Sequence, residues 1–201
     1  MADTTGLRER KNARTRVAIE RAALELTLER GFEHTTVDQI AARADVAPRT
    51  VFSRYATKDA IVFKDKGSGF QAWLDGPADS FVERLGDFIR ESINARSDDA
   101  ELERLRWRAT LTDPYLRQGL RGRLDTAESL IADRVAEHYG LPPGDAGPRV
   151  FAAAVSGLFL VMAERALQDP EAFDPLHDFE RALALLHAGL DALRAGSISS
   201  A

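Results

Sequence analysis

The chain has 201 residues, 44% of them hydrophobic and 29% charged, with a formal net charge of −5. This composition is typical of a soluble globular protein. No cysteine is present, which excludes disulfides, thiolate catalysis and Cys-ligated metals and suits a reducing compartment.

The N-terminal stretch MADTTGLRERKNARTR is polar and basic, unlike a secretory signal. The longest apolar run, residues 151–163, is shorter than the ~18 residues that a membrane span needs. We therefore expect a cytoplasmic protein that has no membrane partner, and we interpret the apolar run as a buried core helix.

Charge is distributed unevenly along the chain. Residues 1–66 contain 13 Lys and Arg against 10 Asp and Glu, whereas residues 67–201 contain 14 against 22. All four lysines lie in the first segment. A mildly basic head on an acidic body indicates an anionic partner for the head alone.

Apolar residues recur at helical spacing along almost the whole chain, and no alternating apolar run is found, so we predict an all-α fold. The first helix is expected from about Arg8 to Arg30 and ends at Gly31. Its inward face carries Ile19, Ala23 and Leu26.

The next helix opens with Thr36, three residues before Gln39. This spacing predicts a capping box, in which the hydroxyl caps a first-turn amide and the glutamine side chain reaches back. The helix is expected to end at Ala44 and Asp45.

The stretch APRTVFSRYATKD, residues 47–59, follows the turn. Pro48 fits the first position of a helix, where no amide proton is needed. Val51, Phe52 and Tyr55 follow at helical spacing, and Thr57 can cap a further helix. Two short helices joined by a turn and packed on a longer one predict a helix-turn-helix unit, whose second helix enters a major groove of DNA.

Residues 22–61 resemble the DNA-binding domain of the tetracycline-repressor (TetR) family of bacterial transcriptional regulators. The resemblance covers about a third of the chain and rests on the following elements: Gly31-Phe32, Thr35-Thr36-Val37, Ile40-Ala41, Ala44, Val46, Thr50, Phe52, Tyr55 and Lys58. Three positions depart from the family pattern. Asp45 and Arg49 stand where members usually or often have glycine, and Tyr55 replaces a frequent phenylalanine.

The resemblance implies a fold of about nine helices in two domains. Residues 1–57 would form an N-terminal arm and a three-helix DNA-binding domain. Residues 58–201 would form a helical domain for effector binding and dimerisation, with a bridging helix from about residue 58.

The resemblance also implies phosphate contacts by Thr36, by the Tyr55 hydroxyl and by Lys58. Arg49, Thr50 and Ser53 lie on the helix turn expected to face base edges, where Arg49 can pair with guanine. Phe52 is included among the DNA-binding residues, although packing into the core remains open. Arg54 is either a DNA contact or a solvated surface residue. The basic arm is expected to follow the DNA backbone or enter a minor groove; its residues are Arg8, Arg10, Lys11, Arg14 and Arg16.

About six helices are expected after residue 67. Residues 148–168 are apolar nearly all round, which fits a helix buried on two sides. The last helix has a heptad-like seam of Leu176, Phe179, Leu183, Leu186, Leu190 and Leu193, which needs a partner helix.

In the TetR family the last two helices pair with those of a second subunit. The resemblance therefore implies a homodimer on a palindromic operator, while packing within one chain remains the alternative. The expected interface residues are Phe151, Val155, Phe179, Leu183, Leu186 and Leu190.

The family also implies a small-molecule effector that binds in the body and displaces the heads. The candidate pocket residues are Phe88, Trp107, Leu111, Phe159 and Met162, for which plain core packing is the alternative. Five arginines could meet an acidic effector such as a fatty-acyl coenzyme A, or could be solvated charges: Arg106, Arg108, Arg117, Arg121 and Arg123.

Two other classes of function were weighed. The chain has four histidines and lacks HExxH, GxSxG and phosphate-binding glycine motifs, so we expect no enzyme, metal or cofactor. A ligand-binding or interaction module without specific DNA binding is the other alternative. We predict a DNA-binding regulator, most simply a repressor released by an apolar or amphipathic effector.

Overall fold

The computed structural model describes residues 3–63, 74–76, 84, 87, 100–142, 144–169, 177–178, 180–182, 184–185 and 188. The fold is all-helical, as predicted, and no strand occurs in these ranges. The prediction of about nine helices extends into residues outside them. The chain divides into two compact units, residues 1–65 with 99–120 and residues 66–98 with 121–201.

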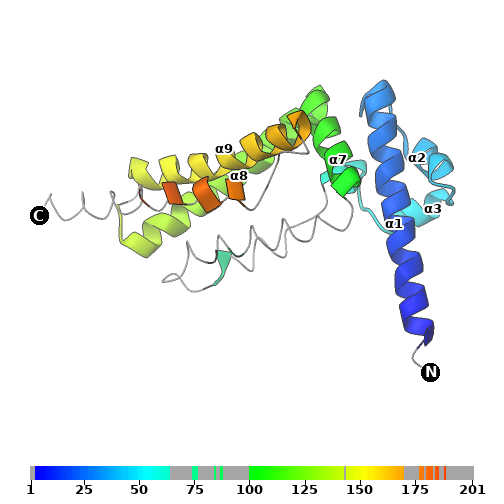
Figure 1. The fold of residues 1–201 in the computed structure, drawn as a ribbon, viewed down its shortest axis with the longest axis horizontal. Coiled ribbons are helices and arrows are strands. Elements are labelled where there is room, and N and C mark those ends of the chain that lie inside the picture. The colour runs from blue at the N-terminus through cyan, green and yellow to red at the C-terminus, as the bar shows by residue number, and fades with distance from the viewer. Residues whose placement is uncertain are drawn as a thin grey trace, which may run out of the picture. The chain divides into compact units, whose positions relative to one another are not determined.

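The first unit is built around the long helix α1, Asp3–Arg30 (Figure 1). It ends where predicted, at Gly31, whose φ of 87° suits a residue without a side chain. It begins earlier than the predicted Arg8, so the expected arm is part of the helix. A core on one face of α1 contains Ile19, Ala23 and Leu26, which confirms the predicted inward face.

Helices α2, Val37–Arg43, and α3, Pro48–Phe52, pack with this face of α1. Helix α4, Lys58–Phe63, begins after Thr57, whose hydroxyl accepts the amide of Ala60 at 3.2 Å as predicted. Helix α4 contributes Ile61 to this core and Val62 to a second one.

The second core lies between α1, α4, α7 (Ala100–Thr112) and the start of α8 (Pro114–Tyr139). Its buried members are Leu24, Phe32, Val62, Leu102, Ala109 and Leu116. The C-terminal half of α1 is therefore covered on two sides, by α2 and α3 on one and by α7 on the other (Figure 1).

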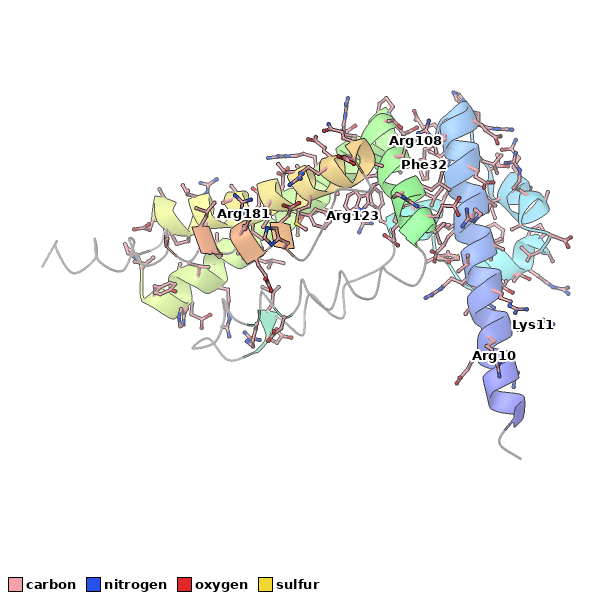
Figure 2. The ribbon with its side chains drawn as sticks, in the orientation of Figure 1. Arg10, Lys11, Phe32, Arg108, Arg123 and Arg181 are labelled. Carbon is pink, nitrogen blue, oxygen red and sulfur yellow. The ribbon has the colours of Figure 1, made fainter. Side chains whose placement is uncertain are left out.

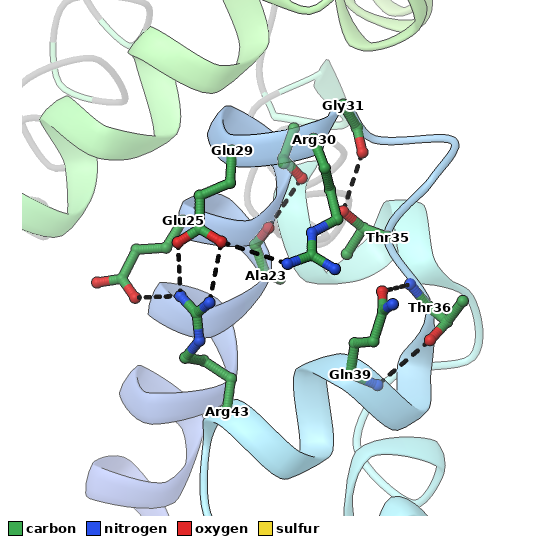
Figure 3. A network of polar contacts seen from close by, with 10 residues as sticks. Ala23, Glu25, Glu29, Arg30, Gly31, Thr35, Thr36, Gln39 and Arg43 are labelled. Carbon is green, nitrogen blue, oxygen red and sulfur yellow. Dashed lines mark hydrogen bonds and ion pairs between the residues drawn. The ribbon is translucent and has the colours of Figure 1, made fainter.

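A surface ion-pair network joins α1 and α2 (Figure 3). Arg43 donates to both carboxylate oxygens of Glu29 at 2.8 and 2.9 Å, and to Glu25 at 3.5 Å. The hydrogen bond from Arg43 holds the pKa of Glu29 below its usual value. These side chains are partly solvated, so the network adds little to stability.

In the second unit, the remainder of α8 is followed by α9, Ala146–Gln168, which Asp145 caps at the amide of Gly147 at 2.7 Å. Buried residues of α9 include Phe151, Ala152, Ser156 and Ala163, whereas Val150 and Val161 are exposed. The expected burial on two sides is therefore incomplete.

The apolar part of α9 is longer than the run counted in the sequence. Residues Ala146–Arg165 are long and apolar enough to cross a membrane by length and composition. Core helices of soluble proteins meet the same criterion.

Candidate nucleic-acid interface

The helix-turn-helix geometry is set by local sequence features. The Thr36 hydroxyl accepts the amide of Gln39 at 3.2 Å, and the Gln39 side chain accepts the amide of Thr36 at 3.0 Å (Figure 3). This is the predicted capping box. In the turn, Asp45 has a φ of 53°, the left-handed conformation that glycine adopts at lower cost.

Helix α3 buries one side and exposes the other. Pro48 occupies its first turn, as predicted, and Val51 is 1% exposed in the core. Phe52 is 64% exposed, so the core alternative for this residue is excluded in the isolated chain. Arg49 and Ser53 are also exposed, while Thr50 is half-buried. The exposed side of α3 thus presents an arginine, an aromatic ring and a hydroxyl together.

Tyr55 follows α3 and points its hydroxyl inward. The ring packs on the core of α1, α2 and α3, and the hydroxyl donates to Glu20 Oε1 at 3.0 Å. Burial, and then the charge of Glu20, raise the pKa of the phenol. A phosphate contact through this hydroxyl would need the same proton, so the structure disfavours the role expected for it.

Lys58 is held against the loop between α1 and α2. Its ammonium donates to the carbonyls of Phe32 at 2.6 Å and Thr35 at 2.9 Å, and lies 4.1 Å from the centre of the Phe32 ring. Burial lowers the pKa of the amine. An ammonium has three donors, and the two carbonyls account for two of them.

The basic residues expected in the arm are exposed on the N-terminal half of α1, where Figure 2 shows Arg10 and Lys11. Arg54, left open above, is exposed and donates to Asn12 at 3.0 Å. This bond connects the end of α3 to the basic part of α1.

Two residues that the sequence analysis did not name, Glu20 and Asp113, hold the residues of this surface in place, and Arg106 joins them in a role other than the one expected for it. Glu20 is 2% exposed and binds Tyr55 on one side and Arg106 of α7 on the other. Asp113 accepts the amide of Phe32 at 2.8 Å. A signal for Glu20 existed, because a carboxylate beside Ile19 and three residues before Ala23 falls on an otherwise apolar face.

Comparison with known proteins identifies the family. Residues 19–64 match the model described as bacterial regulatory proteins of the tetR family, and residues 79–191 match the MftR C-terminal domain of that family. The second match covers more than half of the chain. The protein belongs to the TetR family of transcriptional regulators.

Relatives of this TetR-family protein include the putative mycofactocin biosynthesis transcriptional regulator MftR of Mycobacterium tuberculosis, which is 32% identical over 92% of this chain and 95% of that protein. The HTH-type transcriptional regulator TcmR of Streptomyces glaucescens is 54% identical, over 34% of this chain and 30% of TcmR. The chain therefore spans less than a third of TcmR and nearly the whole of MftR.

Two solved repressors share the TetR fold. NalD, the secondary repressor of the MexAB-OprM multidrug efflux pump in Pseudomonas aeruginosa, is 25% identical with a TM-score of 0.62, covering 87% of this chain and 96% of NalD. SmeT, the repressor of the SmeDEF efflux pump of Stenotrophomonas maltophilia, is 25% identical with a TM-score of 0.55, covering 86% of this chain and 88% of SmeT.

The effector-pocket residues predicted for this TetR-family chain fall into three groups. Trp107 and Leu111 are half-buried in the first unit, Phe159 and Met162 are half-buried in the second, and Phe88 lies outside the described residues. The pocket therefore stays a prediction. Arg106 is the exception among the arginine candidates, because it is buried and pairs with Glu20, whereas Arg108, Arg117, Arg121 and Arg123 are exposed.

The second unit has a surface hollow of about 470 Å³ between α8 and α9. It is lined by Arg121, Asp125, Glu128, Ser129, Ala132, Arg149, Val150 and Ala153. Arg121 is one of the arginines considered for an acidic effector, whereas none of the five apolar pocket candidates lines this hollow. Among the residues described, no group of three or more His, Asp or Glu could hold a metal.

The predicted dimer residues of α9 differ in exposure, since Phe151 is buried and Val155 is half-buried. The others, Phe179, Leu183, Leu186 and Leu190, lie outside the described residues.

Proposed function

We propose that this TetR-family regulator is a homodimeric, cytoplasmic repressor that binds a palindromic DNA operator through α3. A small apolar or amphipathic effector would release it. The observation that carries the proposal is the exposed side of α3, where Arg49, Phe52 and Ser53 project from a helix anchored by Val51. NalD and SmeT are both described as repressors, which supports repression here.

On this proposal the exposed side of α3 reads bases. Arg49 donates two hydrogen bonds to a guanine, and Thr50 and Ser53 contact neighbouring base edges. The Ser53 hydroxyl acts there as an acceptor, because it donates to the Thr50 carbonyl at 3.0 Å. The Phe52 ring, lacking a polar group, fits against a thymine methyl. Such contacts specify the sequence, whereas contacts with phosphates fix the register.

The phosphate contacts come from outside this side of α3. The Thr36 hydroxyl accepts from Gln39, and its proton remains available to a phosphate. Lys58 supplies its third N–H, and the basic residues of α1 add charge along the backbone. We assign Tyr55 to the protein side of the interface, because its hydroxyl donates to Glu20.

We assign DNA binding to residues 1–57 and effector binding with dimerisation to residues 58–201. The exposed apolar residues of α9, Val150 at 67% and Val161 at 54%, support a protein contact there, since a second copy would remove them from water. A twofold dimer presents its recognition helices one DNA turn, or a multiple of it, apart.

Operator selection from a random duplex library tests this function. The full chain should enrich a palindrome whose half-sites are separated by about 10 base pairs or a multiple. Binding should weaken steeply as salt rises, because phosphate contacts release counterions. Enrichment of no sequence would favour the alternative of a ligand-binding module without specific DNA binding.

A further inference from the structure

The buried carboxylate of Glu20, on α1, connects Arg106 of α7 with Tyr55, which lies three residues beyond the end of α3. Glu20 Oε1 accepts from the Tyr55 hydroxyl at 3.0 Å, and Glu20 Oε2 accepts from Arg106 Nη2 at 2.7 Å. The Glu20 side chain is 2% exposed and that of Arg106 is 8% exposed. Arg16 lies 3.9 Å from Oε1 but is largely solvated.

Arg106 extends the connection to α4. Its Nη1 donates to the carbonyls of Ile61, at 3.1 Å, and Val62. These carbonyls lie in the last turn of α4, where no amide of the same helix can reach them. The Nε donates to Glu103 at 3.4 Å. One guanidinium therefore satisfies the end of α4 and the charge of Glu20 together.

Such a network is lost as a unit. A buried ion that loses its partner is strongly destabilising, because its charge is left uncompensated in the interior. If α7 or the end of α4 shifts and Arg106 leaves Glu20, the carboxylate must either follow it or take up water. In the first case the Tyr55 hydroxyl loses its acceptor, and in the second the acceptor is no longer held in place by Arg106.

Packing alone does not require the Tyr55 hydroxyl. The ring already fills its place against the core of α1, α2 and α3, and a phenylalanine would fill the same space. The hydroxyl adds a single directed bond to Glu20. Backbone bonds from Ser53 to Arg49 and from Tyr55 to Val51, both 3.0 Å, attach this residue to α3. These bonds link the residue that carries the hydroxyl to the helix that carries Arg49.

We propose that Glu20 and Arg106 are positioning residues for DNA binding, which hold α3 through Tyr55 and make its placement depend on the end of α4 and on α7. Neither residue touches DNA. The inference rests on the proposed function, in which α3 is the helix that reads bases. The inference places the Tyr55 hydroxyl in the protein interior and gives movement of α4 or α7 a direct route to the DNA-binding surface.

A double-mutant cycle tests the coupling. The variants are Tyr55→Phe, which keeps the ring, and Arg106→Lys, which keeps the charge but has one nitrogen for both Glu20 and α4. Each should weaken binding of the selected operator about tenfold, the size of one hydrogen bond to a charged group. The double variant should bind the operator with an affinity no more than about twofold below that of the more weakly binding single variant.

Additive losses would overturn the proposal, as would a loss with Tyr55→Phe alone, which is the result expected if the hydroxyl binds a phosphate. The salt dependence of binding should stay unchanged in all three variants, because no cationic phosphate contact is removed. Arg104→Lys is the matched control, since Arg104 is exposed on the same helix.

A readout without DNA separates this inference from the proposed function. Hydrogen exchange at the amides of Ser53, Arg54 and Tyr55 should be faster in Arg106→Lys and in Tyr55→Phe than in the wild type and the Arg104 control. Faster exchange with no selectable operator would refute the function and retain the coupling. Unchanged exchange in both variants would refute the coupling even if an operator is found.

Discussion

Asp113 accepts a hydrogen bond from the backbone amide of Phe32 at 2.8 Å, across 81 residues of sequence. Its other carboxylate oxygen accepts the amide of Leu116 at 3.0 Å and caps α8. The Phe32 ring stacks on Tyr115 with centroids 5.0 Å apart, and Lys58 lies over the same ring. The loop that leads to Thr36 is therefore fixed from α8 on one side and from α4 on the other.

Replacing Asp113 by alanine should lower the free energy of unfolding by about 2 kcal/mol, because a helix cap and a charge-assisted hydrogen bond are lost together. Urea denaturation measures the change. Asp125→Ala is the control, since Asp125 pairs with Arg121 at 2.9 Å on the exposed side of α8 and should cost under about 1 kcal/mol. Equal losses in the two variants would contradict the role given to Asp113.

The turn between α2 and α3 should become more stable with glycine. Asp45 holds a φ of 53°, a conformation that costs an ordinary L-residue about 1–2 kcal/mol, and aspartate somewhat less. We expect Asp45→Gly to raise the melting temperature and Asp45→Val to lower it. A glycine variant that melts at a lower temperature than the wild type would show that backbone strain at Asp45 does not limit the stability of the protein.

The bond between Tyr55 and Glu20 predicts a pH dependence. Burial raises the pKa of Tyr55 in the folded state, so the folded chain retains a proton that the unfolded chain releases near pH 10. The stability of the wild type relative to Tyr55→Phe should therefore be constant below about pH 9 and fall as pH rises through 10. Urea denaturation of both proteins from pH 7 to 11 measures this difference. If the difference in stability between the wild type and Tyr55→Phe does not change with pH, the Tyr55 hydroxyl is solvated and the prediction is wrong.

Helix α9 should carry part of the dimer interface. Val161 is 54% exposed, and a charge at an apolar contact between subunits is costly because it must be desolvated. Val161→Asp should convert the dimer to a monomer in sedimentation equilibrium, with helix content retained. Leu130→Asp is the comparison, since Leu130 is 41% exposed on α8 and lies outside the proposed interface. A dimer that survives the Val161 change would exclude this part of α9.

Short-range features of the DNA-binding unit could be predicted from sequence. The capping box of Thr36 and Gln39 and the place of Pro48 in the first turn of α3 each depend on residues within a few positions. Their geometry is therefore determined by the local chain.

The supports of the interface could not be predicted in the same way. Glu20 and Arg106 are 86 residues apart, and no local pattern indicates which charges will be buried together. The inward turn of the Tyr55 hydroxyl depends on that pair. For the same reason the resemblance assigned the Tyr55 hydroxyl to a phosphate, whereas in the structure this hydroxyl donates to Glu20.

Operator selection repeated with Arg49→Ala tests the central claim, that α3 reads bases through its exposed side. Arg49 is exposed at the start of α3, and it departs from the family pattern. The variant should lose its preference for guanine at one position of each half-site, at a cost of about 1–3 kcal/mol there, and keep its preference elsewhere. Arg104→Ala should select the wild-type sequence. An unchanged preference in Arg49→Ala would contradict the account.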